Sequence, residues 1–145
     1  YANSSRIESH MKNHLPADHR QYLKDLPFYR FIECDGKKYL LNHGGVQTRF
    51  ASFPKSDLMS DEELIETISQ NNSASFLWSN TPVHNPHEMH RFKTCTQVFG
   101  HKIVSNPILS DHYCAIDLGC GTGGPRKLCA LILPEREFFI VDEII

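Results

Sequence analysis

Two short apolar segments joined by Asp35-Gly36 are the feature that most limits the folds open to this chain. Residues 28–33 (FYRFIE) and residues 39–42 (YLLN) are both rich in aromatic and branched side chains. An Asp-Gly pair favours a two-residue β-hairpin turn, because both turn positions take a positive φ. The sequence therefore predicts two antiparallel strands, the second of which delivers His43-Gly44-Gly45 at a strand-to-loop corner.

Further strands are expected in the second half of the chain. Apolar runs bounded by turn residues predict strands at residues 97–99, 113–118, 128–133 and 138–142, with a turn at Pro134–Glu137 between the last two. The first of these runs enters Gly100-His101. Together with the hairpin, these segments predict an α+β fold with mostly antiparallel or mixed strands and flanking helices.

Two helices are expected in the first half of the chain. Pro16 suits a first helical position, and the apolar residues after it predict a short amphipathic helix that ends before Pro27. Ser60 and Glu63 form a capping-box pattern that predicts a second helix from Ser60 to Gln70. Residues 80–91, which contain two Pro, two Asn and three His, predict an ordered loop.

Length and composition exclude several classes of protein. A chain of 145 residues is expected to form a single domain, here 1–145, and a net charge of −2 disfavours a general nucleic-acid-binding surface. The longest unbroken apolar run, 128–133, is far shorter than a membrane span, and no signal peptide is visible. Five Cys without a C-x-x-C pair indicate reduced thiols and a cytoplasmic location. Because the chain opens at Tyr1, we expect its natural start to lie upstream.

His43 and His101 are the candidate metal ligands. Each adjoins glycine at a predicted strand end, where the small residue allows a metal, a phosphate or a second loop to approach the main chain. Each pair taken alone is weak evidence, since a loop or core histidine without a ligand role gives the same pattern.

The order of the motifs adds to this evidence. The series LPADHRQYLKDLPFYRFIECDGKKYLLNHGGV, FLWSNTP, VFGHKIVSNPI and YCAIDLGCGTGGPRKLCALIL resembles the C-terminal half of calcineurin-like metallophosphoesterases over residues 15–142. The series is similar above all to phosphoprotein phosphatases and symmetrical dinucleoside tetraphosphatases. The resemblance implies half of a β-sandwich flanked by helices, and a sheet face left for the missing half or for a second copy to cover.

The same resemblance implies the chemistry. His43 and His101 match two histidines of a dinuclear centre of Mn, Fe, Ni or Zn, whose metal-activated hydroxide attacks a phosphoprotein or a dinucleoside polyphosphate. The family's motifs G-D-x-H, G-D-x-x-D-R-G and G-N-H-[ED] do not occur in the chain. We therefore expect the metal site to be incomplete, the N-terminal half of the domain to be missing, and the fragment to be inactive by itself.

Two positions depart from the family pattern. Asn80 stands where many bacterial members carry a phosphate-binding Arg, which leaves Arg91 to compensate or the chain inert, and Lys102-Ile103 replaces Thr-Pro. Neither a nucleophilic Ser nor a Cys–His pattern is present, so no catalytic residue is assigned within the chain.

Other interpretations remain open. Asp117–Gly124 (DLGCGTGG) is similar to the cofactor loop of S-adenosylmethionine-dependent methyltransferases, although only 21 residues follow it. A non-catalytic remnant that binds a partner is a third hypothesis. His84, His87 and His90 recur every three residues, and we interpret them as polar loop residues because Pro82 and Pro86 disfavour a helix there.

Overall fold

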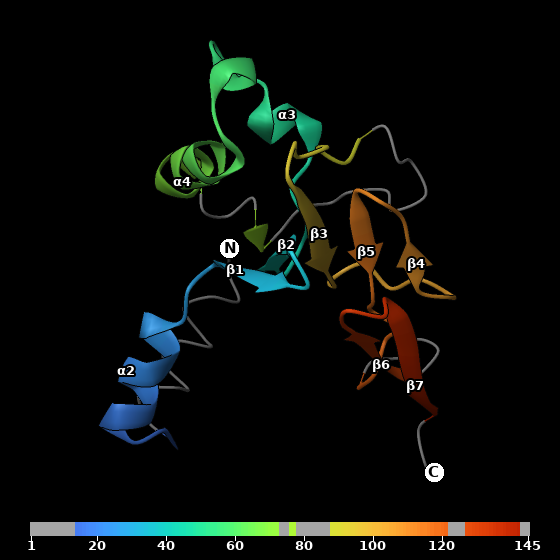
Figure 1. Ribbon diagram of the computed structural model, residues 1–145. Helices are drawn as coiled ribbons and strands as arrows, with labels where there is room; N and C mark the ends of the chain where they lie inside the picture. Colours follow the sequence, from blue (N-terminus) through green and yellow to red (C-terminus); the bar gives the residue numbers. More distant parts are fainter. Residues whose placement is uncertain (1–13, 73–75, 78–87, 122–126, 143–145) are drawn as a thin grey trace.

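The chain contains a mixed five-stranded sheet, a separate two-stranded sheet and a few short helices, which confirms the α+β class (Figure 1). The computed structural model describes residues 14–72, 76–77, 88–121 and 127–142. The five-stranded sheet has the order β1-β2-β3-β5-β4. Its strands are β1 (Tyr29–Cys34), β2 (Lys37–Asn42), β3 (Cys95–Phe99), β4 (Ile108–Leu109) and β5 (Tyr113–Ala115).

The hairpin predicted at Asp35-Gly36 joins β1 to β2. Cys34 pairs with Lys37, and the two turn residues have φ values of 50° and 69°. Positive φ at both positions is the geometry of the turn that matches the right-handed twist of the flanking strands. The prediction of the hairpin is confirmed.

The centre of the sheet is parallel. β2 pairs in parallel with β3, which in turn pairs in parallel with β5. The carboxyl ends of these three strands therefore meet at one edge of the sheet. Chain segments that follow β2, β3 and β5 are brought together there although they are far apart in the sequence.

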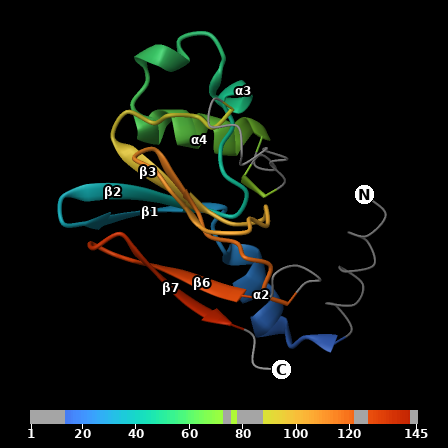
Figure 2. The ribbon, with the colours of Figure 1, turned by 90° about the vertical axis from the view of Figure 1, so that its right-hand side faces the viewer.

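One face of the sheet is covered by helices α3 (Thr48–Ala51) and α4 (Asp61–Asn72) (Figure 2). Leu64, Ile65 and Ile68 of α4 pack with Leu40 and Cys95 of the sheet in a fully buried cluster. The short 3₁₀-helix η1 (Ser56–Leu58) precedes α4.

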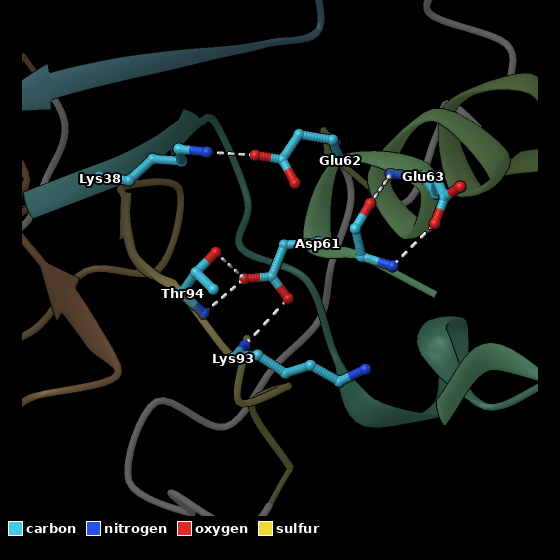
Figure 3. A network of polar contacts seen from close by, with 7 residues as sticks. Lys38, Asp61, Glu62, Glu63, Lys93 and Thr94 are labelled. Carbon is cyan, nitrogen blue, oxygen red and sulfur yellow. Dashed lines mark hydrogen bonds and ion pairs between the residues drawn. The ribbon is translucent and has the colours of Figure 1, made fainter. Parts of the chain in front are cut away.

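The start of α4 is fixed by polar contacts on both sides (Figure 3). The Ser60 main-chain N–H donates to Glu63 Oε2 (2.8 Å), and the Glu63 N–H donates to Ser60 Oγ (3.2 Å), so the predicted capping box is confirmed. Asp61 Oδ2 accepts from the N–H and the hydroxyl of Thr94, and Asp61 Oδ1 accepts from the Lys93 N–H. We call Asp61, Lys93 and Thr94 the Asp61 clamp; it ties the first turn of α4 to the segment that enters β3.

The opposite face of the sheet carries β6 (Lys127–Ile132) and β7 (Glu137–Asp142), an antiparallel ribbon (Figure 2). Leu131 and Leu133 pack against Tyr39, Val98 and Cys114 of the sheet. The outward face of the ribbon is exposed and mainly apolar; it consists of Leu128, Ala130, Ile132, Phe139 and Val141, with Glu137 opposite Ile132 at one end.

Four details differ from the sequence-based expectations. The strand expected over residues 113–118 ends at Ala115, since Asp117 Oδ1 accepts from the Gly119 N–H and turns the chain. The helix expected to end at Gln70 runs to Asn72, because the Asn71 side chain donates to the Thr67 carbonyl within the helix.

The other two concern α2 and β4. Helix α2 (Ala17–Asp25) forms as expected, but none of its residues is buried, and Tyr22 is 67% exposed. The two-residue strand β4 was not predicted, since so short a run carries no periodicity. Among the described residues, no helix is long and apolar enough to cross a membrane.

Candidate metal-binding edge of the sheet

His43 and His101 lie side by side at the carboxyl edge of the parallel strands. His43 directly follows β2, and His101 follows β3 after Gly100. The His43 Nε2 and His101 Nδ1 atoms are 3.0 Å apart, and the Gly100 N–H donates to the His43 carbonyl (2.9 Å). Two ligands of one metal centre must converge, so the resemblance implies that the two histidines lie on neighbouring loops at one edge of the sheet; the structure confirms this proximity, whereas their ligation of a metal stays a prediction.

Two glycines shape the turn after His43. The Gly44 N–H donates to the Phe76 carbonyl at 2.6 Å, and a side-chain carbon on Gly44 would lie 3.1 Å from that same oxygen. Gly45 has φ +75°, and a carbon there would lie 2.9 Å from Met89 Cε. The positive φ of Gly45 favours glycine, and a side-chain carbon on Gly44 would press against the Phe76 main chain, so both glycines suit the turn that presents His43.

The turn at His101 is strained. His101 is one of the few non-glycine residues with positive φ (65°), and the Lys102 N–H donates across it to the Gly100 carbonyl at 2.7 Å. A three-residue turn of this kind is rare, and such backbone strain is typical of functional sites. Burial lowers the pKa of His101, the neighbouring His43 and Lys102 lower it further, and Asp117 opposes them. The neutral imidazole that a metal requires is thereby favoured.

Gln97 of β3 fixes the chain beyond His43, which sequence reasoning missed. Its fully buried amide accepts from the Val46 N–H (2.7 Å) and donates to the carbonyls of Val46 (3.3 Å) and His90 (2.7 Å). A buried amide is tolerated only when its polar atoms are paired. A glutamine inside an apolar strand run was the one available sequence signal.

A groove of about 460 Å³ opens at this edge, lined by His43, His101, Asp117, Cys120 and Lys127 together with apolar side chains. Asn42 also contributes to its lining. The Asn42 Oδ1 accepts from the Gly45 N–H, while its buried Nδ2 has no hydrogen-bond partner within the described ranges.

The edge offers two imidazoles and no larger ligand set. In the part of the chain that the structure describes, no group of three or more His, Cys, Asp or Glu side chains is placed to hold a metal ion. His84, His87 and Asn80 lie outside the described residues. His90 packs edge-on against Phe92, with ring centroids 4.6 Å apart, and Arg91 is exposed.

Burial raises the pKa of three of the cysteines, Cys95, Cys114 and Cys129. All five are free thiols, and burial together with the Asp61 carboxylate raises the pKa of Cys95 to about 12. A thiol with so high a pKa is protonated at neutral pH and is a poor nucleophile.

The glycine-rich segment joins two strands. Gly119 and Gly121 have φ values of 81° and 79°, β5 precedes the segment, and β6 begins at Lys127. A nucleotide-binding loop needs a helix immediately after it. The position of β6 leaves no room for a long helix, so the geometry gives no support to the methyltransferase hypothesis.

Comparison with models of known protein families and with curated proteins finds no match to this chain. The assignment of a function therefore depends on the geometry of the edge and on the motifs that the sequence presents.

Proposed function

We propose that this chain supplies part of the active site of a metal-dependent phosphoesterase, with His43 and His101 as two of its metal ligands. The observation that carries the proposal is the 3.0 Å separation of His43 Nε2 and His101 Nδ1 at the carboxyl edge of the sheet. Two imidazoles, each at the end of a parallel strand, converge as ligands of one metal centre must. Mn, Fe, Ni and Zn are the metals that this ligand type accepts.

The substrate proposed is a phosphoprotein or a dinucleoside polyphosphate. A metal pair activates water and binds phosphoryl oxygens. Two histidines do not complete the coordination of two ions. Carboxylate ligands must therefore come from a further polypeptide segment or from another molecule.

The outward face of the β6–β7 ribbon supports a contact with that further part. Leu128 is 60% exposed, Phe139 is 59% exposed, and the cross-strand partner of each is also apolar. A continuous apolar surface on a two-stranded ribbon is typical of a surface that a second element covers. The partner proposed for this apolar surface is either the N-terminal half of the domain that the resemblance implies or a second copy of the chain.

Calorimetric titration with Mn²⁺ and Zn²⁺ tests the metal site. We expect His43→Ala and His101→Ala each to weaken binding by roughly 10-fold or more, because a single imidazole remains. His19→Ala, an exposed histidine on α2, is the control and should bind as the wild type does. Metal binding that is absent, or unchanged in the His43 and His101 variants, would overturn the proposal.

Hydrolysis of p-nitrophenyl phosphate tests the expected incompleteness of the site. With added Mn²⁺, residues 1–145 should show negligible turnover, because no carboxylate bridges two ions and no metal-bound hydroxide forms. Activity should appear when the carboxylate-bearing half of a metallophosphoesterase domain is supplied. Robust turnover by the isolated chain that is abolished by His43→Ala would instead show that the chain holds a complete site.

A further inference from the structure

A third parallel strand ends at the same edge as the two histidines. β5 is the parallel neighbour of β3, and its chain continues through Ile116 to Asp117. Asp117 lines the same groove as His43 and His101. The topology thus brings a carboxylate close to the histidine pair. It comes from the end of β5, which supplies none of the proposed metal ligands.

Main-chain hydrogen bonds hold Asp117 against the turn that carries His101. The Ile116 N–H donates to the Phe99 carbonyl (3.0 Å), and the Val104 N–H donates to the Asp117 carbonyl (2.9 Å). These two bonds lie on either side of Gly100–Lys102 in the sequence. The strained turn at His101 is therefore joined to the Ile116–Asp117 segment by a main-chain hydrogen bond on each side.

The carboxylate itself is directed by a short local contact. Asp117 Oδ1 accepts from the Gly119 N–H at 2.8 Å. A side-chain carbon placed on Gly100 would lie 3.6 Å from Asp117 Oδ2. One carboxylate oxygen therefore keeps the loop after β5 in place, while the other lies against the residue that precedes His101.

We propose that Asp117 is a positioning residue for the His43–His101 pair: its main chain is bonded to the His101 turn, and its carboxylate, which lies against Gly100, balances the charge of a divalent cation bound there. This inference rests on the proposed function. Neutral imidazoles bring no negative charge to a dication, so a carboxylate behind them strengthens binding. We assign Asp117 this supporting role and not that of a ligand, since its Oδ1 already accepts from the Gly119 N–H.

Asp117→Asn tests the charge, because asparagine keeps an oxygen that can accept from the Gly119 N–H. Titration with Zn²⁺ at fixed pH should show binding weakened by about 10-fold. Asp111→Asn is the matched control: Asp111 is 92% exposed and pairs with Arg136 away from the groove. Its binding should equal that of the wild type. Equal affinities of the Asp117→Asn and Asp111→Asn variants would overturn the inference.

Two further measurements separate the possible failures. If the wild type binds no metal through His43, the proposed phosphoesterase site fails; if it does, and only Asp117→Asn is without effect, the positioning role alone fails. With Co²⁺ as probe, Asp117→Asn should lower the affinity without moving the absorption bands of the bound ion, and displaced bands would show that Asp117 is a ligand. If Asp117→Asn does not fold, Asp117→Ser, which also keeps an acceptor, takes its place.

Discussion

The Asp61 clamp and the histidine edge are both polar, yet they differ in how their polar atoms are paired. In the clamp, a carboxylate that is 2% exposed receives three hydrogen bonds from Lys93 and Thr94 (Figure 3). At the edge, the His43 and His101 imidazoles contact each other, the Asn42 Nδ2 donor has no hydrogen-bond partner within the described ranges, and the backbone at His101 is strained.

The difference separates polar groups that stabilise the fold from polar groups available for chemistry. Three hydrogen bonds to a buried carboxylate stabilise the native state, and removing the carboxylate leaves the three donors unsatisfied. The two imidazoles contact each other beside a strained turn, and strained backbone and clustered titratable side chains are typical of functional sites.

Asp61→Asn should have the largest effect on stability. The variant loses the charge that two N–H groups and one hydroxyl contact, and we expect the free energy of unfolding to fall by about 2–3 kcal/mol. Urea denaturation measures it. Asp57→Asn is the control, because Lys93 Nζ contacts the main-chain carbonyl of Asp57 and not its carboxylate. Similar losses in both variants would contradict the role assigned to the clamp.

The same clamp predicts an acid-sensitive term in stability. Burial raises the pKa of Asp61, but hydrogen bonds from Lys93 and Thr94 lower it by more, so that the net pKa lies below the usual value. A carboxyl group with a lowered folded-state pKa contributes stability above its unfolded pKa of about 3.9, and this stability is lost as pH falls through the folded value. Unfolding measured from pH 5 downward should show a shallower loss in Asp61→Asn than in the wild type.

Gln97→Leu should have an intermediate effect. It leaves the Val46 N–H and the His90 carbonyl without their buried partner, which costs about 1–2 kcal/mol. Gln97 bonds the chain just after the His43 turn, whereas Thr94 belongs to the Asp61 clamp. For a similar loss of stability, Gln97→Leu should therefore lower the Zn²⁺ affinity more than Thr94→Val does. If the two variants lose the same Zn²⁺ affinity, Gln97 stabilises the fold, as the clamp does, and does not position His43.

His101→Gly should have the smallest effect on stability, with the opposite sign. Glycine takes a φ of 65° without strain, whereas its greater freedom in the unfolded chain opposes the gain, so we expect a change of about 0.5 kcal/mol in favour of the native state. Metal binding should be weakened as in His101→Ala. A clear destabilisation, followed by thermal unfolding, would show that the imidazole supports the fold.

Local signals in the sequence predicted the elements that depend on local chemistry. Asp35-Gly36 fixed the hairpin, and Ser60 with Glu63 fixed the start of α4, because the deciding hydrogen bonds join neighbouring residues. The proximity of His43 and His101 was expected from the order of motifs, and the structure confirms it.

The contacts that join distant segments were not predicted. Asp61 reaches residues more than 30 positions away, and Gln97 reaches Val46 across 51 positions. Asp117 was considered only as part of a glycine-rich motif, since its position beside His101 follows from the parallel pairing of β3 with β5. The pattern of apolar and polar residues along the chain does not indicate which distant strands pair.

The parallel pairing of β2 with β3 has a consequence for the order of folding. The hairpins β1–β2 and β6–β7 close over short turns, whereas β2 and β3 are separated by the whole segment from His43 to Thr94. Closing so long a loop costs conformational entropy before its contacts compensate, and pairing between distant strands is slow for that reason. The two imidazoles meet only once β2 and β3 have paired, so we expect the edge proposed to bind a metal to assemble after the two hairpins.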